Sequence, residues 1–361
     1  MNEIKKQVKD FLKSDEKIII INVPKDFKVR SLVNPFRLCY NRIILTIQKM
    51  IPPYRFKNAL LKSTGMKMGK DVCMAHYHKL DYYFPELIQI DDACIVGGLT
   101  KIFTHELKDG KLKLGRVHIK KNALLAGMSR IHPGVTVGEH VITGMKCNIS
   151  KDCPDKTFVV AQDRIVKEWT DEDMNRLFHK SRHHKDYYKD LKKKSKELRK
   201  NRDMMILRIL NDGKRLNPGN EWYLARPVWK IYWNSIWIEL AYYANWNWLR
   251  VLFLKILGVK IGKNFQVGKR TVFDHIYGDL AEIGDNVKIG NDCYVDGHSY
   301  TIGETVFGRV KIEDNVKVGN GTLIACGVIL HKGCKIIGPA SAIKNIPENE
   351  TWKGIPAKKI E

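Results

Sequence analysis

Aliphatic residues recur every six positions along two stretches of the chain, and this period constrains the fold more than any other feature. The repeated positions are Ile119, Leu125, Ile131, Val137, Thr143 and Ile149, then Ile312, Val318, Ile324, Leu330, Ile336 and Ala342. An α-helix repeats every 3.6 residues and a strand every two, so neither produces a period of six. A parallel β-helix does, because each short strand buries one aliphatic side chain before the chain turns. We therefore predict a mainly β protein in which stacked coils share one elongated core.

A second period, of 193 residues, relates the two halves of the chain. Gly65 to Lys70 matches Gly258 to Lys263, and Asn41 matches Asn234 within segments that look helical. This period predicts an internal duplication in which each copy is a helical segment followed by a parallel β-helix. The expected organisation is an N-terminal segment at 1–30, a first domain at 31–169, a basic helical linker at 170–223 and a second domain at 224–361.

The composition limits the compartments and partners. The eight cysteines are scattered without a C-x-x-C pair, so we expect reduced, structural thiols. Met1 to Lys17 is polar and the apolar run from Ile18 to Val23 is too short for a signal core or a span, so we expect a cytoplasmic protein. The formal net charge of +24 favours an anionic partner such as nucleic acid, a lipid surface or a phosphorylated small molecule. No reader motif is present, so nucleic acid is not expected.

Two segments between the copies have a strongly biased composition. We expect Thr170 to Leu210 to form one long helix that ends at the turn Asn217-Pro218-Gly219, and its basic residues fit either a solvated linker or an anionic-surface contact. Six of the eight tryptophans lie between Trp222 and Trp248. Residues 222–256 therefore fit either peripheral contact with an anionic membrane or packing against a β-helix or a neighbouring subunit.

Each copy places a histidine at the same point of the repeat. His105 and His298 are 193 residues apart, and each follows an aliphatic coil residue by three positions. The six-residue rhythm breaks directly after each histidine, which predicts loops at 106–114 and 299–307 that leave the coil.

These features together resemble the hexapeptide-repeat acyltransferases, the family that includes maltose, galactoside and xenobiotic acetyltransferases. The matching stretches are Phe84 to Glu106, Ala281 to His298 and the closing Gly354 to Lys358. The resemblance implies two tandem left-handed parallel β-helices, homotrimers with active sites in clefts between adjacent β-helices, and acetyl-CoA or another acyl-CoA as co-substrate. It also implies transfer of the acyl group, most simply acetyl, to a hydroxyl or amine of a small molecule or glycan, such as a polysaccharide or lipid-linked sugar, with no metal.

The same resemblance gives roles to particular residues. It implies that His105 and His298 act as general bases toward the acceptor, which suits an imidazole because its pKa lies near neutral pH. It further implies that acceptor binding or histidine orientation falls to Asp81, Asp274 and Glu106, and coenzyme A binding to Lys151, Lys344, Lys358 and Gly127. The aspartates also fit corner turns of a β-helix, and the lysines also fit a solvated surface.

Two other classes of protein remain open at this point. A trimeric β-helix without catalysis would serve as a scaffold, for example at a membrane or within a biosynthetic complex. A γ-type carbonic anhydrase on the same fold would need three converging zinc ligands, for which His76, His78 and His105 are the candidates. The paired H-x-x-x-x-H spacing of that family is missing from the sequence.

Overall fold

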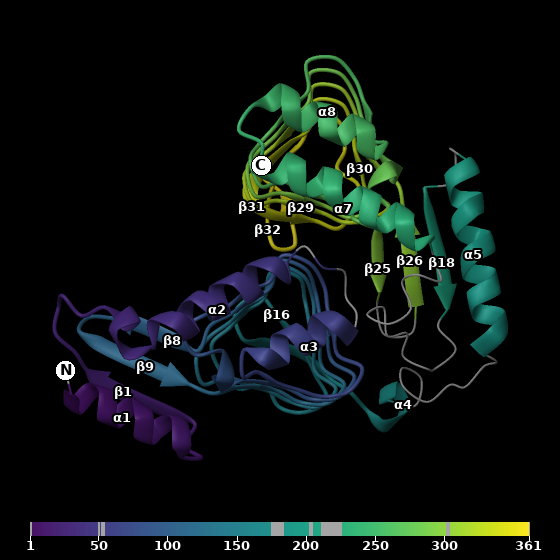
Figure 1. Cartoon of the computed structure of the whole chain (residues 1–361). Helices are drawn as coiled ribbons and strands as arrows, with labels where there is room; N and C mark the ends of the chain where they lie inside the picture. The colour runs from purple at the N-terminus through teal and green to yellow at the C-terminus, as the bar shows by residue number, and fades with distance from the viewer. Residues whose placement is uncertain are drawn as a thin grey trace. The chain divides into compact units, whose positions relative to one another are not determined.

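The computed structural model describes residues 2–49, 51, 55–174, 184–201, 205–210, 226–300 and 304–360. These residues form two compact units, one mainly from Met1–Thr170 and the other mainly from Asp171–Leu216 and Glu221–Glu361. Each unit is a parallel β-helix that begins with two helices and projects a β-hairpin from one of its coils (Figure 1).

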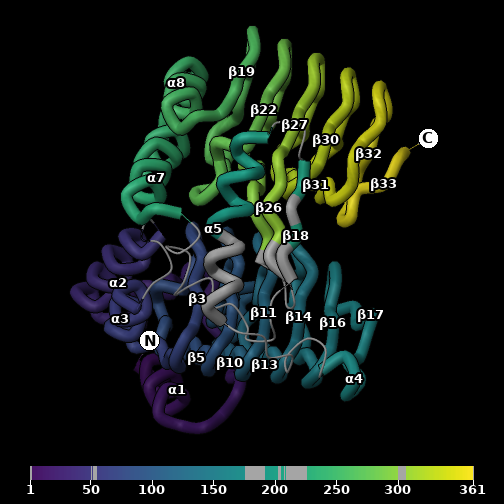
Figure 2. Tube along the Cα trace, turned by 90° about the vertical axis from the view of Figure 1, so that its right-hand side faces the viewer, coloured from purple at the N-terminus to yellow at the C-terminus, as the bar shows by residue number. Residues whose placement is uncertain are grey.

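The first β-helix consists of three parallel sheets, one for each face of its coils (Figure 2). One sheet contains β2 (Lys67–Met68), β5 (Ile88–Ile90), β10 (Val117–Ile119) and β13 (Thr136–Val137). The next contains β3 (Cys73–Met74), β6 (Ile95–Val96), β11 (Leu124–Leu125), β14 (Ile142–Thr143) and β16 (Thr157–Val160), with β17 (Arg164–Glu168) antiparallel at its edge. The last contains β4 (Lys79–Leu80), β7 (Lys101–Ile102), β12 (Arg130–Ile131) and β15 (Asn148–Ile149).

The second β-helix repeats this plan. Its first face contains β19 (Lys260–Ile261), β22 (Ala281–Ile283), β27 (Val310–Ile312) and β30 (Ile329–Leu330). The other two faces contain β20 (Gln266–Val267), β23 (Lys288–Ile289) and β28 (Lys317–Val318), and β21 (Val272–Phe273), β24 (Tyr294–Val295) and β29 (Leu323–Ile324). The long strand β31 (Lys335–Ala342) pairs with both of these faces, and β32 (Thr351–Gly354) with β33 (Lys358–Lys359) closes the stack.

The residues at the six-spaced positions form the core, as the period predicts. In the first stretch all of them are buried, and the ladder places Ile119 between Ile90 and Val137 of the neighbouring coils. Corner residues such as Asn122 and Asn286 have positive φ, a conformation that asparagine adopts more readily than most residues. Burial of one such aliphatic side chain contributes about 1.5–3 kcal/mol. The predicted mainly β architecture of stacked coils is therefore confirmed.

Two helices precede each β-helix, α2 (Pro35–Ile47) with α3 (Arg55–Ser63) and α7 (Val228–Tyr243) with α8 (Asn247–Leu257). The buried Asn41 of α2 donates from Nδ2 to the carbonyl oxygen of Tyr82 at 3.1 Å. Its counterpart Asn234 of α7 donates to the carbonyl oxygen of His275 at 2.8 Å. Both donors and both acceptors are 193 residues apart, so the duplication holds at the level of single hydrogen bonds.

A buried cation ties the second helix of each pair to the preceding turn. Lys57 Nζ donates to the carbonyl oxygen of Ile51 at 3.1 Å, and Arg250 Nη1 donates to that of Ala244 at 3.0 Å. These pairs are also 193 residues apart. Burial lowers the pKa of Lys57 to about 7. The hydrogen bond of this lysine to Ile51 holds the second helix against the turn before it.

The segments expected as loops after the two histidines are antiparallel hairpins. They consist of β8 (His105–Lys108) with β9 (Lys111–Gly115), and of β25 (His298–Tyr300) with β26 (Glu304–Gly308). A third strand completes each small sheet, β1 (Ile18–Asn22) beside β9 and β18 (Ile206–Leu210) beside β26. The added strand covers an edge that would otherwise present unpaired backbone groups.

The structure therefore differs from the expected boundaries at 1–30 and 170–223. Residues 1–30 belong to the first unit, to which they contribute α1 (Asn2–Lys13) and β1. The expected linker is not one long helix, because its described part forms α4 (Asp171–Met174), α5 (His184–Lys200) and β18, which belong to the second unit. The physical reason is the pairing of β18 with the hairpin. The predicted turn at 217–219 lies outside the described residues.

The two helix–strand segments are equivalent, although their spacing differs from the general period. Gly134 and Gly327 both have positive φ, and a Cβ atom on them would lie 2.4 Å from the Ile18 side chain and 2.8 Å from the Ile206 side chain, respectively. Ile18 and Ile206 are 188 residues apart, whereas the glycines are 193 apart. A search at one fixed period consequently misses this part of the duplication.

Candidate active site

At the base of each hairpin a histidine contacts a buried aspartate. His105 Nδ1 is hydrogen-bonded to Asp81 Oδ2, and His298 Nδ1 to Asp274 Oδ2; we call these pairs the first and second dyads. The aspartate side chains are both 1% exposed, while the histidine rings keep 20% and 17% of their surface exposed. Each aspartate directly follows a coil strand and each histidine begins a hairpin, so coil and hairpin together build the dyad.

Backbone N–H groups fix the orientation of both carboxylates. Asp81 accepts from the backbone nitrogens of Tyr83 at 2.9 Å and Thr104 at 3.1 Å. Asp274 accepts in the same way from Tyr277 at 2.7 Å and Gly297 at 3.0 Å. A carboxylate that accepts several N–H bonds is stabilised in its ionised form. The two aspartates that the sequence suggested for acceptor binding or orientation therefore both contact the histidines.

The electrostatics of the dyads favour ionised aspartates. Burial on its own raises the pKa of Asp81, but the hydrogen bond and charge of His105 and the backbone donors bring it below its ordinary value. Burial likewise opposes ionisation of Asp274, yet His298 outweighs burial and lowers the pKa of Asp274. Burial lowers the pKa of His298, the neighbouring Asp274 raises it, and the pKa of His298 is raised overall. An ionised aspartate at Nδ1 leaves Nε2 as the nitrogen that exchanges a proton.

A tyrosine ring lies beside each histidine. The rings of Tyr83 and His105 meet edge to face, 5.2 Å apart and 89° between planes. In the second unit Tyr277 lies 6.0 Å from the His298 ring, and its hydroxyl contacts Ser195 Oγ of α5 at 3.2 Å. The segment expected as a linker thus packs directly behind the second dyad.

A pocket of about 310 Å³ opens beside the first dyad. Its lining residues are Leu80, Asp81, Tyr82, Tyr83, Phe103, His105, Glu106, Leu107, Arg130, His132 and Pro133. The lining includes Glu106, which the sequence analysis proposed for acceptor binding or orientation. It also includes Arg130 and His132, which are not among the predicted site residues and do not recur in the second copy. A small molecule in this pocket would therefore lie beside His105.

The second dyad contains a third ionisable side chain, Asp296, where the first unit has Phe103. Ligand atoms of Asp274, Asp296 and His298 lie within 4.8 Å of one another. Burial, together with the nearby Asp274, raises the pKa of Asp296 well above its ordinary value. Asp296 is not among the site residues predicted from the sequence, although the exchange of Phe103 for an acid at the 193-residue spacing is a visible signal.

The zinc alternative is not supported by these contacts. In the described part of the chain, the one group of three His, Cys, Asp or Glu side chains close enough to share a metal is Asp274, Asp296 and His298. His76, His78 and His105 do not form such a group. In the observed group both Asp274 oxygens already accept backbone N–H bonds, so a carboxyl pair that shares a proton explains the contact better than a cation.

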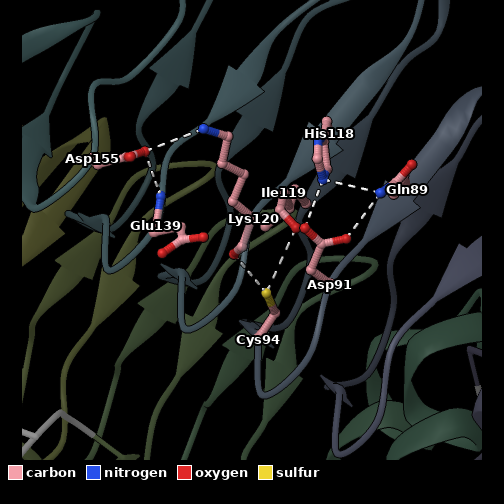
Figure 3. A network of polar contacts seen from close by, with 8 residues as sticks. All are labelled: Gln89, Asp91, Cys94, His118, Ile119, Lys120, Glu139 and Asp155. Carbon is pink, nitrogen blue, oxygen red and sulfur yellow. Dashed lines mark hydrogen bonds and ion pairs between the residues drawn. The ribbon is translucent and has the colours of Figure 1, made fainter.

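Another Asp–His pair in the first unit shows which features set the dyads apart. On an outer face, His118 Nε2 contacts Asp91 Oδ2 at 2.7 Å, with Gln89 beside both (Figure 3). Both side chains are 33% exposed. The corresponding residues of the second unit are Lys311 and Gly284, so this pair is not duplicated. Burial of the aspartate and repetition at 193 residues thus separate the dyads from an ordinary surface contact.

The residues proposed for coenzyme A are not among those that line the first pocket. Lys151, Lys344 and Lys358 are exposed, and none of them lines the pocket beside His105. A Cβ atom on Gly127 would lie 3.2 Å from the Gly98 carbonyl oxygen, which gives this glycine a role in the close stacking of coils. Their assignment to the cofactor stays a prediction.

The proteins similar to this chain each match about two fifths of its length. No protein-family model matches the chain. "Putative acetyltransferase YvoF" of Bacillus subtilis is 31% identical over 150 residues, which cover 41% of this chain and 86% of that protein. "Putative acetyltransferase SAS0727" of Staphylococcus aureus is 30% identical over 142 residues, 39% of this chain and 88% of that protein. The maltose O-acetyltransferase structure from Clostridium difficile aligns with 37% of this chain and 86% of its own, with 21% identity and a TM-score of 0.33.

Stacked parallel coils around one elongated core place the chain in the left-handed β-helix fold class. The chain belongs to the hexapeptide-repeat acetyltransferase family, because it is 31% identical to the Bacillus relative over 86% of that protein's length. The predicted family, fold class and enzyme class are thereby confirmed.

Proposed function

We propose that the protein transfers an acetyl group from acetyl-CoA to a hydroxyl or amine of a sugar, polysaccharide or lipid-linked sugar, with His105 and His298 as general bases. The observation that carries this proposal is the recurrence of one buried Asp–His dyad at the base of a hairpin in both units. Each histidine side chain keeps part of its surface exposed, and in the first unit His105 lines the pocket.

The chemistry is a direct acyl transfer. Nε2 takes the proton of the acceptor hydroxyl while the acceptor oxygen forms a bond to the thioester carbonyl carbon. The carbon–sulfur bond then breaks, and the imidazolium returns the proton to the departing thiolate, so that atoms and charges balance. The aspartate at Nδ1 keeps the ring in position and stabilises its charged form. General-base assistance of this kind contributes about 10²–10⁴ in rate.

Solved relatives are described as complexes with acetyl-CoA and with coenzyme A, which supports acetyl-CoA as the donor here. Lys151, Lys344, Lys358 and Gly127 are the proposed coenzyme A contacts, as point charges toward phosphates and a close-approach glycine. A homotrimer that forms the clefts between β-helices is part of the same proposal. All eight cysteines are free thiols, which supports a reducing, cytoplasmic location.

The decisive experiment is release of free thiol from acetyl-CoA with a panel of sugar acceptors. The intact chain is compared with the double variant His105→Ala/His298→Ala, and the mass of both proteins is measured. We expect acceptor-dependent release from the intact chain, at least a hundredfold less from the double variant, and the same trimeric mass for both. Absence of acceptor-dependent release from the intact chain would favour the non-catalytic scaffold.

A further inference from the structure

The first helix of each pair exposes a row of apolar side chains with the same spacing in both units. In α2 the row is Phe36, Tyr40, Ile43 and Ile47; in α7 it is Trp229, Trp233, Ile236 and Leu240. Every member has its counterpart 193 residues away. Phe36 is 86% exposed and Trp229 68%, and the other members are 39–54% exposed. The second helices continue the surface, with Phe56 on α3 and Trp248 and Leu252 on α8 exposed as well.

These helices carry large apolar side chains on the outward side as well as on the buried side. A helix on the surface of a globular protein turns its apolar side inward and its polar side to water. Here the buried side combines Asn41 and Asn234, whose amides donate to backbone carbonyl groups, with aliphatic residues. The outward side nevertheless carries further large apolar residues, as the exposed rows show. A contiguous exposed apolar surface of this kind marks an interaction site.

The charges around both rows have one sign. Residues 35–63 contain no aspartate or glutamate, and residues 228–257 contain only Glu239, which is buried. Arg37, Arg42 and Lys255 are exposed beside the apolar rows. A second copy of this chain, with its net charge of +24, would bring like charges together at such a surface. Anionic lipid, in contrast, complements both the cations and the apolar side chains.

We propose that the helix pairs α2–α3 and α7–α8 are each a docking surface for an anionic lipid bilayer. Tryptophan and tyrosine prefer the level of the lipid headgroups. The first row contains Tyr40, and the second contains Trp229 and Trp233. None of the helices in the described parts of the chain has the length and hydrophobicity that a membrane span needs, so the helices lie along the interface. The surface extends the contact considered for residues 222–256 to an equivalent site in the first unit, and it does not depend on the acyltransferase chemistry.

The test is flotation of the full chain with vesicles of phosphatidylcholine containing phosphatidylglycerol, beside vesicles of phosphatidylcholine alone. Phe36→Ser/Ile43→Ser changes the first surface, and Trp229→Ser/Ile236→Ser changes the second. A variant with all four substitutions, called the fourfold variant, changes both. The matched control is Ile337→Ser/Ile343→Ser, which replaces two similarly exposed isoleucines of the second β-helix. All substituted side chains are exposed, so folding is expected to be preserved and is checked by thermal unfolding.

We expect flotation with the anionic vesicles that weakens as salt rises, because headgroup charges are screened within about 10 Å at 0.1 M salt. Each double variant should bind at least fivefold more weakly, the fourfold variant should not float, and the control should float like the parent. Equal flotation of the fourfold variant and the parent would overturn the proposal. The proposal would also be overturned if the fourfold variant floated like the parent but had a lower oligomeric mass in the absence of lipid. The surface would then join copies of the chain.

Discussion

Asp296 and Asp274 place two buried carboxyl groups side by side at the second dyad, with their oxygens within 4.8 Å. Repulsion between two buried carboxylates makes ionisation of both groups unfavourable, so one of them keeps its proton. The raised pKa of Asp296 and the N–H bonds to Asp274 assign the proton to Asp296. The first dyad has Phe103 at this position and lacks the second carboxyl group. The two sites therefore share a geometry but differ in the number of buried carboxyl groups beside the histidine.

Replacement of Asp296 by Asn should shift the pH dependence of the second site alone. Asp274 raises the pKa of His298, and Asp296 adds to this rise wherever it loses its proton, whereas an asparagine cannot ionise. His298 must be neutral to act as a base. In a His105→Ala background we expect the acidic limb of the rate profile to move down by up to about one pH unit. The measurement is thiol release from pH 5 to 9, with Asp292→Asn, an exposed carboxyl, as the control. An unchanged limb would show that Asp296 does not act on His298.

Replacement of Asp81 by Asn should disable the first site through its histidine. The amide cannot serve both as charge partner for the ring and as acceptor for the backbone donors, so the ring loses its fixed tautomer. In a His298→Ala background we expect turnover to fall by about 10²–10⁴. Asp91→Asn breaks the exposed contact with His118 and should leave turnover unchanged. If both variants retained turnover, the dyad would not position the base.

Much of the fold could be predicted from the sequence because the coils of a β-helix produce a short, regular repeat of residue types. One inward aliphatic per strand, as at Ile119 and Val137, and corner residues with positive φ, as at Asn286, are local requirements that recur from coil to coil. The pairing of β1 and β18 with the hairpins could not be predicted, because it joins segments about 100 residues apart, as the hydrogen bond from Arg116 Nε to the Glu16 carbonyl illustrates.

The site was predictable only where it repeats. Repetition at 193 residues pointed to both histidines and both aspartates of the dyads before any geometry was known. Asp296 breaks the repetition, and Arg130 with His132 lines the first pocket without counterparts, so a search for equal residues passes over them. Exposed lysines such as Lys151 have no local signal that distinguishes a phosphate contact from a solvated surface.

The second dyad should stabilise the fold in a limited range of pH. The lowered pKa of Asp274 contributes stability that is present above its ordinary value and lost as pH falls through the lowered one. The raised pKa of His298 contributes stability that is full below its ordinary value and lost as pH rises through the raised one. The urea stability of the parent minus that of His298→Gln should thus be largest from about pH 4 to 6.5. A difference that grows above pH 8 would contradict this assignment.

Loss of Arg309 should loosen the segment before the second β-helix. Its buried guanidinium donates from Nη2 to the carbonyl oxygen of Leu198 in α5 at 2.6 Å. We expect Arg309→Gln to lower the free energy of unfolding by about 2–3 kcal/mol and to expose α5 to limited proteolysis. Arg270→Gln, which removes an exposed ion pair with Asp292, should cost less than about 1 kcal/mol. Equal effects of the two variants would mean that α5 is not an integral part of the unit.

The most direct measurement of the central claim is acceptor-dependent turnover of His105→Ala and His298→Ala, assayed side by side with the parent and the double variant. If each dyad is a complete general-base site, each single variant keeps measurable turnover and only the double variant falls by about 10²–10⁴. Turnover in the double variant equal to that of the parent would contradict the account, and a single variant as inactive as the double variant would restrict catalysis to one unit.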